Sequence, residues 1–272
     1  MTEKLISDGL VLLDLDADGV DGLGRLRLNR PEASNGMNVP FLRALYDAVM
    51  AAHGEPRLRV LLLTGEGPNF CAGGDVKTFA SKGAGLPDYL REATSWLQTC
   101  VQGLLSLQVP VIASVHGYAA GGGGFGLVCA SDIVIAGESA KFLAGATRVG
   151  MAPDAGVSVT LPLLVGLRKA LDIILTNPVL TAAEALEIGL ITRVVPDDAL
   201  AAESLALAES LACGPTRALG AAKRLVWSGL GARVEAQLPE EARTVAELSG
   251  TPDAREGLAA VIERRAPRFS GR

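Results

Sequence analysis

A run of four glycines, within GYAAGGGGFG at residues 117–126, constrains this chain more than any other feature. It lies between two short apolar stretches, PVIASVHG at 110–117 and DIVIAG at 132–137, which have the composition of buried strands. Glycine loses more backbone freedom on folding than any other residue, so such a run is costly. We therefore expect the fold to need bare backbone here, either for close packing or to face a ligand.

The run matches the dinucleotide-binding pattern GxGxxG at Gly121, Gly123 and Gly126. The next strand begins near Asp132, however, which leaves room for only about one or two turns of helix. A crossover between parallel strands normally takes about a dozen residues or more. Because the interval is too short, and because a lone match to this pattern is weak, we do not interpret the glycines as a nucleotide site.

A second glycine-rich segment, FCAGGDV at 70–76, follows the apolar stretch RVLLLTG at 59–65. Two such junctions of strand and glycine could direct two backbone N–H groups at one oxygen atom. A pair of this kind stabilises an oxyanion, and each donor contributes about 2.7–4 kcal/mol to catalysis. The alternative is that the glycines only permit tight turns and close helix packing, which is the simpler interpretation of either loop alone.

The composition excludes several classes of protein. The 272 residues carry a net charge of −5, which argues against a general nucleic-acid or membrane-surface role. The N-terminus has no signal-peptide pattern and no stretch offers about 18 uncharged apolar residues, so we expect a cytoplasmic protein with free thiols. We expect no metal site, since no CxxC or histidine ligand spacing occurs among Cys71, Cys100, Cys129, Cys213, His53 and His116.

Hydrophobic periodicity predicts an α/β segment followed by helices. Strands are expected at 10–16, 24–29, 59–65, 110–117, 132–137 and 191–196. Helices are expected at 41–52, 94–107 and 181–189, and then at 198–212, 216–228, 232–249 and 253–264. The third of these has a capping box at Thr181 and Glu184. Residues 76–90 are mixed and favour a mobile surface loop. We divide the chain into a core at 1–197 and a helical region at 198–272.

Several segments together resemble the crotonase superfamily, also called the enoyl-CoA hydratase/isomerase family. Spread over residues 25–196, they are RLRLNRPEASNGMN, FCAGGDV, PVIASVHGYAAGGG, SDIVIA, AKF, VGMAPDAG and LTAAEALEIGLITRVVP. The C-terminal ERRAPRFSGR is also similar. The order and spacing of the segments carry the resemblance. It implies an α/β fold, a spiral of ββα units, followed by helices that drive formation of trimers, often dimers of trimers.

The resemblance also implies an acyl-CoA thioester as the ligand, with coenzyme A as part of the substrate and no separate cofactor. The thioester oxygen would lie between two backbone N–H groups and be stabilised as an enolate. By motif the first donor is Gly74, in a substrate-binding loop with Ala72 and Asp75. Counting forward along the glycine run selects Gly122 as the second donor, whereas counting back from the next strand selects Gly123. We keep both.

Hydratases of this family use two glutamates, and this chain lacks both. The first would fall at Phe125 or Gly126, depending on the count, and the second at Ala146. We count Phe125 and Ala146 among the expected substrate-binding residues. Adding water across a double bond requires that water be activated and the neighbouring carbon protonated, which suits two positioned carboxylates. The sequence therefore argues against hydration.

Within the motif segments, one acid remains at a position that the family uses for proton transfer: Asp154 in MAPDAG. Members with PDxG at this point resemble 1,2-epoxyphenylacetyl-CoA isomerase and other enoyl-CoA isomerases, in which this aspartate is the acid/base. A dehalogenase of the family has its nucleophilic aspartate at the same offset, but it needs a histidine on the helix before PVIASV, and TSWLQTCVQGLLSL has none. The alternative role for Asp154 is to cap the helix that follows, for which Asp is a favoured residue.

We therefore predict an acyl-CoA isomerase, because a single carboxylate can move a proton from one carbon to another. Two alternatives stay open: an enoyl-CoA hydratase that uses acids from elsewhere, and a protein that binds acyl-CoA without turnover. Phe79 and Trp96 either line the acyl pocket or pack in the core. The expected partners are the thioester and further copies of the chain, in a homotrimer or a dimer of trimers, with no nucleic acid and no membrane.

Overall fold

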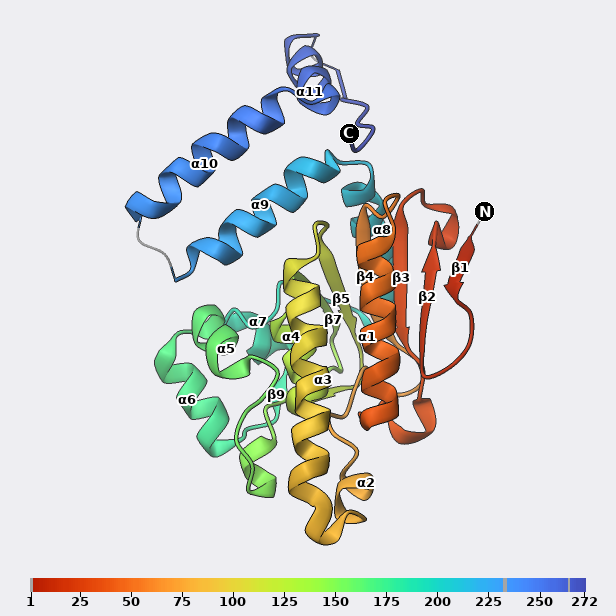
Figure 1. Cartoon of the computed structure of the whole chain (residues 1–272), viewed down its shortest axis with the longest axis vertical. Helices are drawn as coiled ribbons and strands as arrows, with labels where there is room; N and C mark the ends of the chain where they lie inside the picture. Colours follow the sequence, from red (N-terminus) through yellow and green to blue (C-terminus); the bar gives the residue numbers. More distant parts are fainter. Residues whose placement is uncertain (1, 232–233, 264) are drawn as a thin grey trace.

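The main sheet has seven strands among the residues that the structure describes. The computed structural model describes residues 2–231, 234–263 and 265–272 (Figure 1). The strand order is β1-β2-β3-β4-β5-β7-β10, antiparallel from β1 to β3 and parallel from β3 onward. The bounds are Glu3–Ile6, Val11–Leu15, Leu23–Leu28, Val60–Gly65, Val111–Val115, Ile133–Gly137 and Arg193–Val195. The predicted α/β class is confirmed, and the six predicted strands are present.

A second sheet stacks successive turns of the chain on one another. It consists of β6, β8 and β9 (Tyr118–Ala120, Lys141–Leu143 and Leu180–Thr181), with β6 and β8 parallel. Isolated bridges continue this stacking to earlier turns, since Met37 pairs with Gly74 and Cys71 pairs with Ala119. The chain therefore alternates between a strand of the main sheet and a short extended segment of this second layer, which produces a spiral.

The helices occupy most of the remaining described chain. Their bounds, from α1 to α11, are Val39–Gly54, Val76–Ala80, Leu86–Ser106, Gly121–Cys129, Val157–Val165, Leu167–Thr176, Ala182–Glu187, Leu200–Ala212, Thr216–Gly229, Val234–Ser249 and Pro252–Glu263. The predicted capping box at Thr181 and Glu184 is present at the start of α7. Residues 232–233 and 264, at the edges of the last two predicted helices, lie outside the described residues.

The expected loop at 76–90 is wrong, because this segment contains α2 and the first turn of α3. Apolar residues at 86, 90, 93 and 97 recur at helical spacing and lie on one face of α3. Pro87 is compatible with helix here because it sits in the first turn, where its missing N–H would have no partner within the helix. By themselves, the glycines and the proline of this segment favour an irregular structure.

Helices cover both faces of the main sheet (Figure 1). Side chains alternate along a strand, so Leu61 and Leu63 of β4 face one side and Val60 and Leu62 face the other. The first pair packs in a large core with residues of α1 and α3. The second pair packs in a smaller cluster with α8, which is the first helix after residue 197. The division of the chain at residue 197 stays a prediction. α8 lies beyond that boundary, yet it shares a core with the strands before it.

A buried ion pair joins α9 to the rest of the protein. The Lys223 Nζ lies 2.8 Å from Asp132 Oδ2 and donates to the carbonyl oxygens of Leu104 and Val109, at 2.8 and 3.2 Å. Trp227 on the same helix donates its Nε1–H to Asp132 Oδ1 at 3.1 Å. Burial lowers the pKa of Lys223, and the charge of Asp132 opposes that effect. The ammonium group of Lys223 thus has a carboxylate and two carbonyl oxygens as partners inside the protein.

Replacing Lys223 by Met should lower the free energy of unfolding by about 3 kcal/mol, because the change removes the cation beside the partly buried Asp132 carboxylate. That carboxylate then keeps its hydrogen bonds from Val111 and Trp227. Equilibrium denaturation in urea measures the effect. Lys169→Met is the matched control, since Lys169 forms an exposed pair with Asp172 and should cost about 1 kcal/mol or less. Equal losses in the two variants would contradict this account of how α9 is held.

Candidate active site

A cavity of about 600 Å³ opens between the second layer of the spiral and the helices α2 and α3. Its far wall is made by the short 3-10 helix Ala146–Val149 and by the segment that precedes α5. The side chains on the α2 and α3 side are mainly apolar and include Val76, Phe79, Leu86, Leu90, Ala93 and Leu97. Both glycine-rich segments and Asp154 reach this cavity, so it is the candidate active site.

The first glycine loop presents a free backbone donor. The neighbouring groups are used, since Met37 N–H donates to the Gly73 carbonyl at 2.8 Å and Asp75 N–H donates to the Met37 carbonyl at 2.9 Å. The Gly74 N–H donates to no carbonyl or side chain of the described residues. A Cβ on Gly74 would lie 2.5 Å from the ring of Phe79, so a side chain here would have to push that ring aside. Gly74 therefore offers one N–H to the cavity that it lines.

The run of four glycines begins α4 and packs against this first loop. Gly121 has a φ of +60°, and a Cβ on it would lie 3.8 Å from the Gly74 nitrogen. A Cβ on Gly123 would lie 3.2 Å from the Gly73 Cα, and one on Gly124 would collide with the Cys71 carbonyl oxygen. Close packing thus accounts for much of the run.

The same glycines also present donors to the cavity, because the first N–H groups of a helix have no acceptor within it. Gly122 and Gly123 both line the cavity. Neither of their N–H groups donates to backbone outside α4 in the described part of the chain. Both therefore stay candidates for the second oxyanion donor, and the two interpretations of the glycine run are compatible with each other.

Asp75 supports the first loop from behind instead of lining the cavity. Its carboxylate caps α2 by accepting the Thr78 N–H at 3.0 Å, and it pairs with Arg30 at 2.8 Å. Burial alone would raise the pKa of Asp75, but the hydrogen bonds from Thr78 and the pairing with Arg30 hold it below its usual value. Arg30 also donates to the Gly36 carbonyl at 2.7 Å. The Asp75 carboxylate does not line the cavity, so the substrate-binding role expected of it stays a prediction.

Asp154 enters the cavity beside Gly122. A Cβ on Gly122 would collide with the Asp154 carboxylate, so the carboxylate lies directly against that backbone. The helix that follows, α5, begins at Val157 and has Gly156 as its N-cap, without a side-chain cap. The capping role considered for Asp154 is therefore wrong. Its side chain accepts no hydrogen bond from another described residue.

Burial raises the pKa of the Asp154 carboxyl, and a hydrogen bond to its own backbone only partly offsets that effect. Among the described residues that line the cavity, no cation lies within hydrogen-bond reach of it to reverse that effect. Arg148, the other charged side chain among the described lining residues, donates to the Asn177 carbonyl at 2.6 Å. A carboxyl with a raised pKa, in a largely apolar cavity, is suited to proton transfer.

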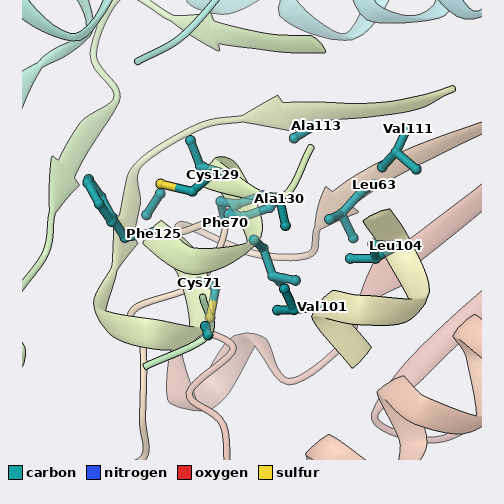
Figure 2. Close-up of a cluster of buried hydrophobic side chains, with 14 of the residues drawn as sticks. Leu63, Phe70, Cys71, Val101, Leu104, Val111, Ala113, Phe125, Cys129 and Ala130 are labelled. Atoms are coloured by element: carbon teal, nitrogen blue, oxygen red, sulfur yellow. The ribbon is translucent and has the colours of Figure 1, made fainter. Parts of the chain in front are cut away.

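The other expected site residues divide into two groups. Ala72, Ala146 and Phe79 line the cavity. Phe125 does not, and its expected substrate-binding role is corrected: its side chain is fully buried and lies among core residues such as Phe70 and Cys129 (Figure 2). α4 turns this position inward because a helix places residue 125 on the face opposite to residue 123.

Contacts within the fold indicate a structural role for three further residues, which are Trp96, His116 and Cys71. Trp96 stacks edge-on with Tyr46 at 5.2 Å and does not line the cavity. His116 bonds through Nε2 to the Gly67 carbonyl at 2.8 Å. Burial raises the pKa of Cys71 to about 12, which disfavours a thiolate beside the first donor.

No group of three or more His, Cys, Asp or Glu side chains among the described residues is arranged to hold a metal ion. No helix in the described part of the chain has the length and apolar character needed to cross a bilayer.

Comparison with known proteins agrees with this geometry. The family described as enoyl-CoA hydratase/isomerase matches residues 19–272. A Rhodobacter capsulatus protein named "Probable enoyl-CoA hydratase" is 40% identical over 252 residues, which cover 93% of this chain and 96% of the relative. The 1,2-epoxyphenylacetyl-CoA isomerase of Escherichia coli is 36% identical over 253 residues, covering 92% and 96%. The crystal structure of an enoyl-CoA hydratase from Bacillus anthracis superposes with a TM-score of 0.90 at 31% identity, covering 97% and 100%.

The chain therefore belongs to the enoyl-CoA hydratase/isomerase family, and the resemblance seen in its motifs is confirmed. Its fold is the crotonase spiral that the resemblance implied. The family consists of enzymes that act on acyl-CoA thioesters.

Replacing Asp154 by Asn should stabilise the folded protein at neutral pH. A carboxyl whose pKa is raised by folding binds its proton more tightly in the folded state, so stability falls as pH rises from the unfolded pKa through the folded one. Asn does not ionise and avoids that loss. We expect a gain in stability at pH 7 that shrinks toward zero near pH 4, as the carboxyl becomes protonated in both states.

Urea denaturation of both proteins between pH 4 and pH 8 measures the difference. Asp8→Asn, the same change at an exposed position, is the control and should leave stability unchanged. A difference between Asp154→Asn and the natural protein that is independent of pH, or that grows toward low pH, would contradict the raised pKa.

Proposed function

We propose that this protein isomerises an unsaturated or ring-containing acyl-CoA, with Asp154 as the acid/base and two backbone N–H groups as the oxyanion hole. The observation that carries the proposal is that a single carboxyl group, and not a pair, lines the described part of the cavity. Asp154 is the one carboxyl among the described residues that line it, and its burial keeps its pKa above the usual value. At the two hydratase positions the chain has Ala146 and either Phe125 or Gly126.

The proposed chemistry needs a single proton carrier. For a 3-enoyl thioester, the Asp154 carboxylate removes a proton from the carbon next to the thioester carbonyl. The electron pair moves onto the carbonyl oxygen, where the N–H of Gly74 and that of Gly122 or Gly123 stabilise the enolate. When the enolate collapses, the double bond forms between the second and third carbons, and the Asp154 carboxylic acid returns the proton to the fourth. No water molecule is consumed.

The cavity also bears on the acyl group. Its volume is about 600 Å³, and apolar side chains of α2 and α3 form the wall that faces the glycines. Burying a charged acyl terminus in such surroundings would be costly without a partner. These features support a bulky, uncharged acyl group as the substrate.

Hydration is the alternative function, since the Rhodobacter capsulatus relative carries a hydratase name. It would require one carboxyl to activate water and protonate the neighbouring carbon, or a second acid from outside the described lining. A protein that binds acyl-CoA without turnover is the other alternative, because the loss of both hydratase glutamates is also compatible with binding alone.

Replacing Asp154 by Asn should lower kcat for isomerisation by about 10²–10⁴-fold while acyl-CoA affinity is kept, since Asn matches the size of Asp but cannot accept the proton. The assay follows rearrangement of a 3-enoyl-CoA or of epoxyphenylacetyl-CoA, and calorimetry measures thioester binding. The natural protein should hydrate crotonyl-CoA slowly or not at all.

Asp88→Asn provides the control, because Asp88 is an exposed residue of α3 that does not line the cavity. Rapid hydration of crotonyl-CoA by the natural protein would favour the hydratase instead. Normal isomerisation by the Asn variant would remove Asp154 from the mechanism. Tight binding of every thioester tested, with turnover of none, would favour the binding protein.

We also propose that the protein assembles as a homotrimer or a dimer of trimers through its C-terminal helices. Figure 1 shows α10 and α11 extending beyond the main body of the chain. Large apolar side chains are exposed on α9 to α11, among them Val226, Leu238, Val245, Leu258 and Ile262. Such surfaces are normally buried against a partner.

Light scattering at micromolar concentration should therefore give a mass of three or six times 28.0 kDa. Removing exposed apolar surface, as in Val245→Asp, should shift the protein toward smaller species, because a charge would have to be buried at the contact. Glu247→Gln, a change at an exposed position of the same helix, serves as the control. The neighbouring Thr244 is unsuitable because it is buried. A monomeric natural protein would contradict the proposal.

A further inference from the structure

The segment that carries Asp154 is held in an unusual conformation. Ala155 has a φ of +52°, in the left-handed region that side chains other than glycine rarely adopt, and it is 1% exposed. Gly156 follows with a φ of +74°. A residue such as Ala155 keeps this conformation only where the surrounding structure holds it there. The position of the Asp154 carboxyl therefore depends on what Ala155 packs against.

Ala155 packs against Gly126 of α4. A Cβ built on Gly126 would lie 2.5 Å from the Cβ of Ala155, 3.7 Å from Val157 Cγ2 and 3.8 Å from the Ala155 carbonyl oxygen. Two carbon atoms cannot approach to 2.5 Å without a bond, so any side chain at 126 must displace Ala155. Because Ala155 is buried, that displacement moves the backbone next to Asp154. Neither residue lines the cavity.

We propose that Gly126 is a positioning residue for catalysis: its missing side chain lets Ala155 seat against α4, and this contact sets the Asp154 carboxyl into the cavity beside Gly122. As regards catalysis, this inference rests on the proposed function. The contact between Gly126 and Ala155, however, acts on the placement of Asp154 whatever reaction the carboxyl serves.

A consequence concerns the two carboxyl arrangements open to this fold. A longer acidic side chain at position 126, such as that of glutamate, would have to enter the space beyond the Gly126 Cα. In this protein the space that a glutamate side chain would enter there is filled by Ala155. An acid at position 126 and an acid held at Asp154 by this packing therefore exclude each other. Gly126 selects the arrangement with one carboxyl, and so it helps to determine the type of reaction.

The pKa of Asp154 reports on the contact between Gly126 and Ala155, because the groups around the carboxyl have little other influence on it. Within α4 the one titratable side chain is Cys129, which is buried in the core, and α5 contains none. Arg148 of the 3-10 helix lines the same cavity and donates to the Asn177 carbonyl. Burial is therefore the main influence on the Asp154 carboxyl, and moving it out toward solvent should lower its pKa.

The test compares the natural protein with Gly126→Ala, Ala155→Gly and the double variant. NMR titration of ¹³C-labelled aspartate, with Asp154→Asn used for assignment, measures the pKa of Asp154 in each. In Gly126→Ala it should fall toward the ordinary value of about 3.9, and in the double variant it should return to the natural value, because the colliding methyl group is gone. With a 3-enoyl-CoA, kcat should fall by about 10²-fold in Gly126→Ala and recover in the double variant.

Gly103→Ala is the matched control. A Cβ there would also lie 2.5 Å from a buried methyl carbon, Val49 Cγ1, but neither residue lines the cavity. This variant should lose stability without a change in the pKa of Asp154 or in kcat. An unchanged pKa in folded Gly126→Ala, no recovery in the double variant, or the same effects in Gly103→Ala would each overturn the proposal.

Two further outcomes are decisive. Should Gly126→Ala fail to fold, the double variant decides: a folded protein with the natural pKa supports the proposal, and an unfolded protein or an ordinary pKa overturns it. Should the natural protein isomerise no thioester, the proposed function fails. The NMR titration still tests, without reference to turnover, whether Gly126 sets the position of Asp154.

Discussion

The contact between two glycine loops is the constraint on which the site depends. Successive turns of the spiral stack at Met37, Gly74, Cys71 and Ala119, so the loops that follow these positions meet backbone to backbone. A Cβ on Gly73 would lie 2.8 Å from the Ala120 carbonyl oxygen, too close for a side chain. Bare backbone allows this approach, and the approach brings the Gly74 N–H and the N-terminus of α4 to one cavity. Packing and ligand binding therefore share the same residues.

Two features of this region are unfavourable in free energy, and the rest of the fold must offset them. Ala155 has a positive φ, which costs about 1–3 kcal/mol, and Asp154 is a partly buried carboxyl without a cationic partner among the described residues. Ala155 belongs to the large buried core, which also includes Phe125 and its neighbours (Figure 2), and this close packing holds its backbone conformation. The two residues are adjacent in the chain, and Asp154 lines the cavity, where raised pKa values are common in enzymes.

α8 packs directly on the main sheet, whereas specific polar contacts join α9 to the core. Lys223 and Trp227 of α9 both bind Asp132, the residue just before β7. Arg59 at the start of β4 donates to Thr216 at 3.0 Å and to the Gly214 carbonyl at 2.9 Å. Polar groups of this kind fix orientation because they must be paired when buried. The apolar side chains that stay exposed beyond α9 are then free to contact another molecule.

The sequence by itself determined the α/β class, the main strands, the capping box of α7 and the family, because these depend on local periodicity and on the order of motifs. It also indicated Gly74, the glycine run and Asp154. Tertiary structure decided what these residues contact: Phe125 turned into the core, Asp75 behind its loop, and Asp154 at the cavity instead of at a helix cap. The roles of Arg30 and Gly126 likewise depend on contacts between segments far apart in the chain. Local pattern does not encode such distances, since they arise only when the turns of the spiral stack.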